Sequence, residues 1–183
     1  MSKNASLEKA TLLNSKRLLA DAVLLKRRKR WHSSVAVTVQ ALEEFGKALI
    51  LRWDVKNDAS KRKFPTHVEK QAATFALLSA DELLAKKGKL LNRFMNCEGV
   101  DFSNVGPYSE QFAFARSGFY ENIRLTVTYQ DEEPIYSSAV TDTIGPEFVS
   151  ELINYVKKAR LAARNPEAMN LASIFYANDL GRL

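Results

Sequence analysis

Two adjacent carboxylates and a lysine lie close together in the segment 41–48, Ala-Leu-Glu-Glu-Phe-Gly-Lys-Ala. Lys47 follows Glu43 by four residues and Glu44 by three, so on a helix it can neutralise either carboxylate. An exposed pair of this kind contributes only about 0.3–0.5 kcal/mol. Glu43, however, lies beside the apolar stripe of the same predicted helix, where a carboxylate needs a partner to offset its lost hydration. The pattern therefore favours a polar site over a solvated helix surface.

That partner is expected on the next predicted helix, where His67 and Lys70 lie three residues apart and share a face. Two carboxylates, two lysines and one imidazole would then meet between helices, as in the polar sites that helical bundles build from facing side chains. A histidine by itself is more often a surface residue. Its pairing with the glutamates is therefore what favours a functional role, in which the imidazole transfers protons.

Helical periodicity predicts the elements that position these residues. Apolar residues recur at steps of three and four from residue 7 to about 29, which predicts a first helix that ends in a run of cations. Ser33 and Ser34 offer capping hydroxyls for a second helix that runs to about Trp53. A short basic turn joins the two helices, which predicts an antiparallel hairpin.

One glycine lies in the middle of the second predicted helix. The apolar stripe of this helix consists of Val35, Val39, Leu42, Gly46 and Leu49. Glycine in a helix interior costs about 1 kcal/mol relative to alanine. We therefore expect either a close approach of another helix or a functional site at Gly46.

Pro65 stands at the start of a third long helix, from about Thr66 to about 96 unless Gly88 ends it. We expect the first three long helices to pack antiparallel. The segment 98–107 is rich in turn-forming residues. A short helix is expected over 109–116, followed by an extended or hairpin stretch that ends near Pro134. Pro146 and Pro166 begin two further helices, and Asn165 offers a cap for the last.

Composition places the chain among ordinary globular proteins. Its 183 residues suit a single domain over 1–183, and a hydrophobic fraction of 46% can bury a sizeable core. The single cysteine, Cys97, excludes an intrachain disulfide framework. No apolar run of signal-peptide or membrane-spanning length is present, so we expect a cytoplasmic protein with no membrane partner. Phosphate-binding and zinc motifs are also missing, and no cofactor or metal is expected.

Positive charge is concentrated in the first third of the chain. The formal net charge is +6, and the segment 1–63 holds fifteen basic and six acidic residues. Such an asymmetry makes polyanions plausible partners, although solubility alone also explains it. Arg27, Arg28 and Arg30, at the end of the first predicted helix, are the candidate binding cations there.

The motif 41–48, together with Phe64, His67 and Lys70 and a later Arg116, Gly118, Phe119, Tyr120 group, resembles AbiV-type abortive infection proteins of the HEPN superfamily. The resemblance runs over about 4–164. It implies an up-and-down helical bundle, a homodimer, and an antiphage effector that halts host growth through RNA or the translation machinery. It also implies a phage-encoded activator. The positions that match its motifs form the implied site: Glu43, Glu44, Lys47, His67, Lys70, Arg116 and Tyr120.

Many HEPN proteins are metal-independent ribonucleases whose motif is an arginine followed, after four to six residues, by a histidine. Two pairs have this spacing here, Arg62 with His67 and Arg27 with His32. In the enzyme that this resemblance implies, His67 transfers protons, Arg62 or Arg116 steadies the phosphate, and Glu43, Glu44 and Lys47 orient them. The residue after Arg62 is not the polar one that commonly follows the motif arginine, which counts against a nuclease.

The alternative is a non-catalytic helical module that binds a phage protein or a ribosome component. In that interpretation the polar cluster fixes helix packing and the basic end of the chain recognises the partner. Glu43→Gln and Lys47→Ala would then lower stability without altering any chemistry.

Overall fold

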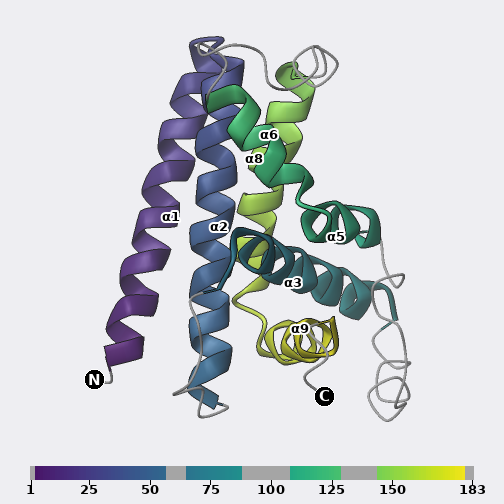
Figure 1. The fold of residues 1–183 in the computed structure, drawn as a ribbon. Helices are drawn as coiled ribbons and strands as arrows, with labels where there is room; N and C mark the ends of the chain where they lie inside the picture. Colours follow the sequence, from purple (N-terminus) through teal and green to yellow (C-terminus); the bar gives the residue numbers. More distant parts are fainter. Residues whose placement is uncertain (1–2, 57–64, 88–107, 129–143, 180–183) are drawn as a thin grey trace.

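The computed structural model describes residues 3–56, 65–87, 108–128 and 144–179, and all regular structure in these ranges is helical (Figure 1). The mainly α fold that the sequence predicts is therefore confirmed. The elements are α1 (Lys3–Arg27), α2 (Trp31–Lys56), α3 (His67–Lys87), α5 (Ser109–Arg116), α6 (Phe119–Thr128), α8 (Pro146–Ala162) and α9 (Pro166–Asp179).

Helices α1 and α2 form the predicted antiparallel hairpin and lie side by side along their length (Figure 1). Buried serine hydroxyls join them. Ser15 donates to the carbonyl of Ala41 at 2.7 Å, and Ser34 donates to the carbonyl of Ala22 at 2.8 Å. The serines predicted as caps are not at the helix start, because α2 begins at Trp31. The Ser34 hydroxyl therefore bonds a backbone carbonyl of α1 and does not cap α2.

A tight turn at Lys29 joins the hairpin. Lys29 is left-handed, with φ of 59°, and its N–H donates to Lys26. The N–H of Arg30 reaches back to the carbonyl of Leu25 at 3.0 Å. This pair of bonds is the Schellman arrangement, whose left-handed position glycine normally occupies. The chain thus places a lysine where the backbone favours glycine.

Lys29→Gly is expected to stabilise the protein, because a left-handed residue with a Cβ costs about 1–2 kcal/mol. A net gain of about 1 kcal/mol corresponds to a rise in Tm of about 2–4 °C for a chain of this size. Thermal unfolding followed by circular dichroism measures it. Arg28→Gly is the matched control, since Arg28 lacks a positive φ and glycine there is expected to lower Tm. Equal shifts for the two variants would contradict this account.

Helix α3 is the centre of the core. All ten residues from 71 to 80 are buried, including Phe75 and Leu77, because α3 contacts α2, α5, α8 and α9. A helix that is buried all round must have neighbours on every side. It crosses α2 instead of running alongside it (Figure 1), so the expected antiparallel packing of three long helices holds for α1 and α2 only. The predicted extension to 96 lies outside the described residues.

The expected extended or hairpin stretch after Gly118 is wrong over Phe119–Thr128, which form helix α6. Gly118 has φ of 80° and makes the turn from α5, whose bounds are those predicted. Tyr120 and Ile123 are buried and lie three residues apart, the helical period. The alternating residues that suggested a strand are too few to outweigh this packing. The rest of that stretch, 129–134, lies outside the described residues.

The last two helices begin where the prolines predict. Pro146 is in the first turn of α8. The side-chain oxygen of Asn165 accepts from the N–H groups of Glu167 and Ala168, at 3.1 and 3.4 Å, and so caps α9 as expected. Helix α9 packs on α3, and the rings of Trp53 and Tyr176 join it to α2 at 5.4 Å between centroids.

Candidate functional site

A buried carboxylate lies where α2 meets α3. Glu43 is 6% exposed, and its Oε2 is 2.7 Å from Nδ1 of His67. Its other oxygen, Oε1, accepts from the amide of Gln71 at 2.8 Å. His67 and Gln71 are four residues apart on α3, so both project from the same face onto one carboxylate. The predicted meeting of an acidic residue of the second helix with the imidazole of the third is thus observed.

A third helix adds a cation to this cluster. Nε of Arg124, on α6, lies 3.9 Å from Oε1 of Glu43, and the Arg124 side chain is 17% exposed. The sequence interpretation missed both Arg124 and Gln71. Gln71 could have been found from its position one turn after His67. Arg124 gave no such signal, because its segment was predicted to be extended. Glu43, His67, Gln71 and Arg124 are called the Glu43 cluster below.

The crossing of α2 and α3 at Gly46 fixes the distance between these groups. A Cβ added to Gly46 would lie 1.7 Å from the backbone oxygen of Lys70 and 3.0 Å from the hydroxyl of Thr74. Thr74 donates to the carbonyl of Leu42 at 3.2 Å across the same crossing. The expected close approach at Gly46 is therefore confirmed. It lies one helical turn from Glu43 on α2, and Lys70 lies one turn from His67 on α3.

The structure does not bring the other predicted residues into this cluster. Glu44 points to α1, where its Oε2 accepts from the Asn14 amide at 3.1 Å. Lys47 is half-buried, and within the described ranges it pairs with neither glutamate. Lys70 contributes its backbone carbonyl to the crossing at Gly46. Of the two carboxylates, two lysines and one imidazole, only Glu43 and His67 meet.

The more distant candidates lie in three different surroundings. Tyr120 is in the core, 3% exposed and stacked on Phe75 with 5.3 Å between ring centroids. Burial raises the pKa of its hydroxyl above the usual range. Arg116 is exposed in the last turn of α5. Arg62 lies outside the described residues. The three candidate binding arginines, Arg27, Arg28 and Arg30, are exposed at the α1–α2 turn.

The second arginine–histidine pair is arranged differently from the first. Nε2 of His32 is buried, and among the described residues it has no hydrogen-bond partner. The His67 side chain is instead 50% exposed. Solvent can therefore reach the His67 side chain but not Nε2 of His32. The geometry favours His67 as the reactive histidine.

The Glu43–His67 pair is suited to proton transfer. A carboxylate on Nδ1 holds a neutral imidazole with its proton on that nitrogen, and it stabilises the imidazolium that forms when Nε2 takes a proton. Gln71 holds the carboxylate by its other oxygen, so the acceptor is fixed before a substrate arrives. Such a pair acts as a general base or general acid.

No group of three histidine, cysteine, aspartate or glutamate side chains within the described ranges is placed to hold a metal ion. None of the helices described above is long and apolar enough to cross a lipid bilayer.

The fold and the site define a helical domain that holds an imidazole over a buried carboxylate where three helices meet. A family model for HEPN AbiV, described as AbiV, matches residues 4–102, more than half of the chain. The chain therefore belongs to the AbiV family of HEPN proteins, a family of abortive-infection defence. Comparisons with curated proteins and with solved structures gave no match.

The family match covers the helices that build the centre of the site. Glu43, Glu44, Lys47 and His67 fall within 4–102. The resemblance was expected to extend to about 164, and the family model supports it only to 102. Arg116, Tyr120 and Arg124 lie beyond the match, so their roles depend on their positions in the fold.

Proposed function

We propose that this protein is an antiphage effector that halts host growth by cleaving RNA without a metal ion, with His67 as the general acid–base. The observation that carries the proposal is the 2.7 Å contact between Nδ1 of His67 and the buried Glu43 carboxylate. This contact joins a Glu43 side chain that is 8% exposed to a His67 side chain that is 50% exposed. A purely structural ion pair does not need its imidazole at the surface.

In the proposed reaction a phosphoryl group of the RNA backbone passes from the 5′ oxygen of one nucleotide to the 2′ oxygen of the nucleotide before it. Nε2 of His67 takes the proton of the 2′-hydroxyl as the O2′–P bond forms and the P–O5′ bond breaks. The leaving 5′ oxygen takes a proton from a general acid or from water, and the product ends in a cyclic phosphate. Glu43 stabilises the imidazolium that forms.

An arginine must stabilise the charge that develops on the phosphate. Arg62 is the motif arginine, five residues before His67, and Arg116 is the exposed alternative on α5. We extend the proposal to a homodimer, because the family resemblance implies that two copies act together. Activation by a phage product is part of the same proposal.

The direct test incubates the full-length protein with total cellular RNA in the presence of a chelator, with and without extract from phage-infected cells. Discrete products ending in a cyclic phosphate are expected. If RNA stays intact under all conditions while the protein still arrests growth, cleavage is not the mechanism.

A second candidate function is a non-catalytic module that binds a phage protein or a ribosome component. The observation in its favour is the exposure of Arg27, Arg28 and Arg30 on a hydrogen-bonded turn at one end of the hairpin. Exposed arginines that are grouped on one turn suit a polyanionic partner. RNA binding that falls steeply with salt, without cleavage, would favour this function.

The stability of the Glu43 cluster can be tested separately from chemistry. Glu43→Gln removes a buried charge that His67, Gln71 and Arg124 all face, and it is expected to lower the free energy of unfolding by about 1–3 kcal/mol. Lys47→Ala is the control, expected to cost about 0.5 kcal/mol or less. Urea unfolding measures both. Equal losses would show that the Glu43 carboxylate does not stabilise the crossing.

A further inference from the structure

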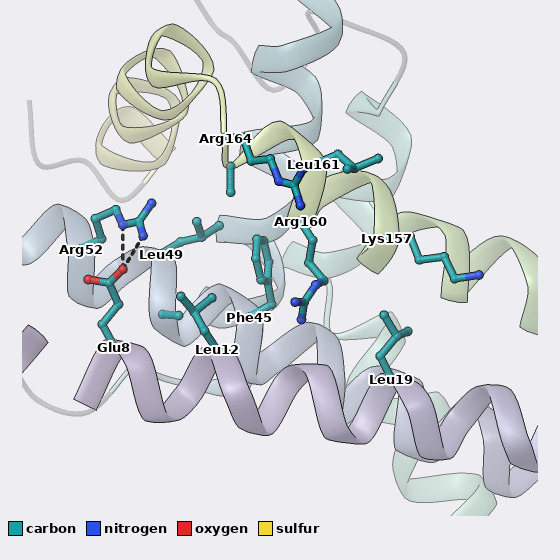
Figure 2. A pocket seen from close by; sticks show the side chains of 12 residues that line it. Glu8, Leu12, Leu19, Phe45, Leu49, Arg52, Lys157, Arg160, Leu161 and Arg164 are labelled. Atoms are coloured by element: carbon teal, nitrogen blue, oxygen red, sulfur yellow. Dashed lines mark hydrogen bonds and ion pairs between the residues drawn. The ribbon is translucent and has the colours of Figure 1, made fainter. Parts of the chain in front are cut away.

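The solvent side of α1 carries two exposed leucines. Leu13 is 60% exposed and Leu24 is 48% exposed. They are eleven residues apart, about three helical turns, so both side chains leave α1 on the same side. Ser15, which donates to a backbone carbonyl of α2, leaves on the opposite side. Leu12 and Leu19 point into the pocket between α1, α2 and α8 (Figure 2). The side of α1 that carries Leu13 and Leu24 is called the outer face below.

Cations surround these two leucines on the helix surface. The neighbours of a helical side chain are the residues three and four positions away. For Leu13 and Leu24 together, these positions hold five cations, two alanines and one carboxylate, all of them exposed: Lys9, Ala10, Lys16, Arg17, Ala20, Asp21, Arg27 and Arg28. The helical hydrogen bonding reaches Arg28, whose N–H donates to the carbonyl of Leu24 at 3.1 Å. The outer face therefore combines exposed apolar side chains with a strong excess of positive charge.

This combination favours an anionic lipid surface over the other partners of a basic helix. Helix α1 lies at the edge of the fold, where it packs on α2 and α8 (Figure 1). A second copy packed through the same face would place cations against cations, which is costly. RNA would pair with the cations through its phosphates but would leave the leucines without an apolar contact. An anionic bilayer suits both, because its headgroups attract cations and its acyl boundary accepts leucines.

We propose that the outer face of α1 binds the surface of an anionic lipid bilayer, with α1 lying parallel to the membrane plane. Each cation near such a surface strengthens binding about fivefold. A contact of this kind needs no membrane-spanning segment. The expectation of no membrane partner considered only apolar runs of signal-peptide or spanning length, so it does not exclude this contact. The outer face does not include the Glu43 cluster, so the proposal is independent of RNA cleavage.

Flotation of the protein with lipid vesicles tests the proposal. One set of vesicles consists of phosphatidylcholine alone, and the other of phosphatidylcholine and phosphatidylglycerol in equal parts. The protein is expected to bind the anionic vesicles at least about tenfold more tightly, and added salt is expected to weaken this binding. Leu13→Ser combined with Leu24→Ser is expected to weaken it at least about tenfold, because the leucines lose their contact with the acyl boundary.

Leu161→Ser is the matched control. Leu161 is also 60% exposed, but it lies on α8, and its replacement is expected to change vesicle binding less than about twofold. Circular dichroism checks that all variants are folded. Because the substituted leucines are exposed, the variants are expected to keep the helical content of the parent.

Other results would overturn the proposal. Binding that does not distinguish the two sets of vesicles, or no binding to either, would reject an anionic lipid surface as the partner. Vesicle binding that the double leucine variant retains would show that the outer face of α1 is not the contact. If the vesicles stay unbound while the double variant dissociates a dimer in light scattering, the outer face is an interface between two copies. If the vesicles stay unbound while RNA binds through the same cations, the face is an RNA surface.

Discussion

His67→Ala is expected to abolish RNA cleavage and the growth arrest that depends on it. Loss of a general acid–base typically lowers a rate by about 10²–10⁴-fold. The imidazole is the group of the Glu43 cluster that is both held by a buried acceptor and half exposed to solvent. Alanine removes Nε2 and leaves Glu43 its contact with Gln71. The measurement is the initial rate of appearance of cyclic-phosphate ends from total RNA in chelator.

The effect on stability separates lost chemistry from lost structure. His67 lies at the first residue of α3 and buries only half of its side chain. Its removal is therefore expected to cost about 1 kcal/mol, so the variant stays folded at assay temperature. His32→Ala is the matched control, because it removes the other histidine of the chain and is expected to retain cleavage. Cleavage unchanged by His67→Ala, or lost equally in both variants, would exclude His67 as the acid–base.

The phase of the apolar stripe on α2 made the central contact predictable from sequence. Adjacent residues on a helix point about 100° apart, so Glu43 and Glu44 could not both face α3. The stripe of Val39, Leu42 and Gly46 placed Glu43 at the edge of the core, where the structure finds it. Glu44 turns to Asn14 on α1 instead. The two adjacent glutamates thus face different helices: Glu43 is a buried acceptor for His67 of α3, and Glu44 contacts Asn14 of α1.

The direction of α3 could not be predicted in the same way. Periodicity shows which face of a helix is buried, but it says nothing about the angle at which two buried faces cross. The ten consecutive buried residues, 71–80, result from neighbours supplied by α5, α8 and α9, all distant in sequence. Arg124 could not be predicted for the same reason, because its helix α6 is distant in sequence from α2 and α3. Its short helix α6 carries alternating apolar residues that local pattern alone assigns to a strand.

Gly46→Ala is expected to lower stability more than any other variant considered above. Gly46 was also the one sequence signal for the crossing of α2 and α3. Alanine would normally gain about 1 kcal/mol over glycine in a helix interior. Here its Cβ would lie 1.7 Å from the Lys70 carbonyl oxygen, so α2 and α3 must separate by at least about 1 Å. We expect a net loss of about 3 kcal/mol or more, which lowers Tm by about 6–12 °C.

The same separation would also remove function, because the crossing sets the 2.7 Å contact between Glu43 and His67. Gly46→Ala is therefore expected to lose RNA cleavage even below its own Tm, whereas Lys47→Ala, one residue further on, keeps it. Gly145→Ala is the control for glycine removal, since its Cβ would meet only Glu147 Oε2 at 3.5 Å. That variant is expected to lose about 1 kcal/mol or less as a changed N-cap. A Gly46→Ala protein as stable and as active as the parent would mean that α2 and α3 do not cross at this distance, and the Glu43 cluster could not then form as described.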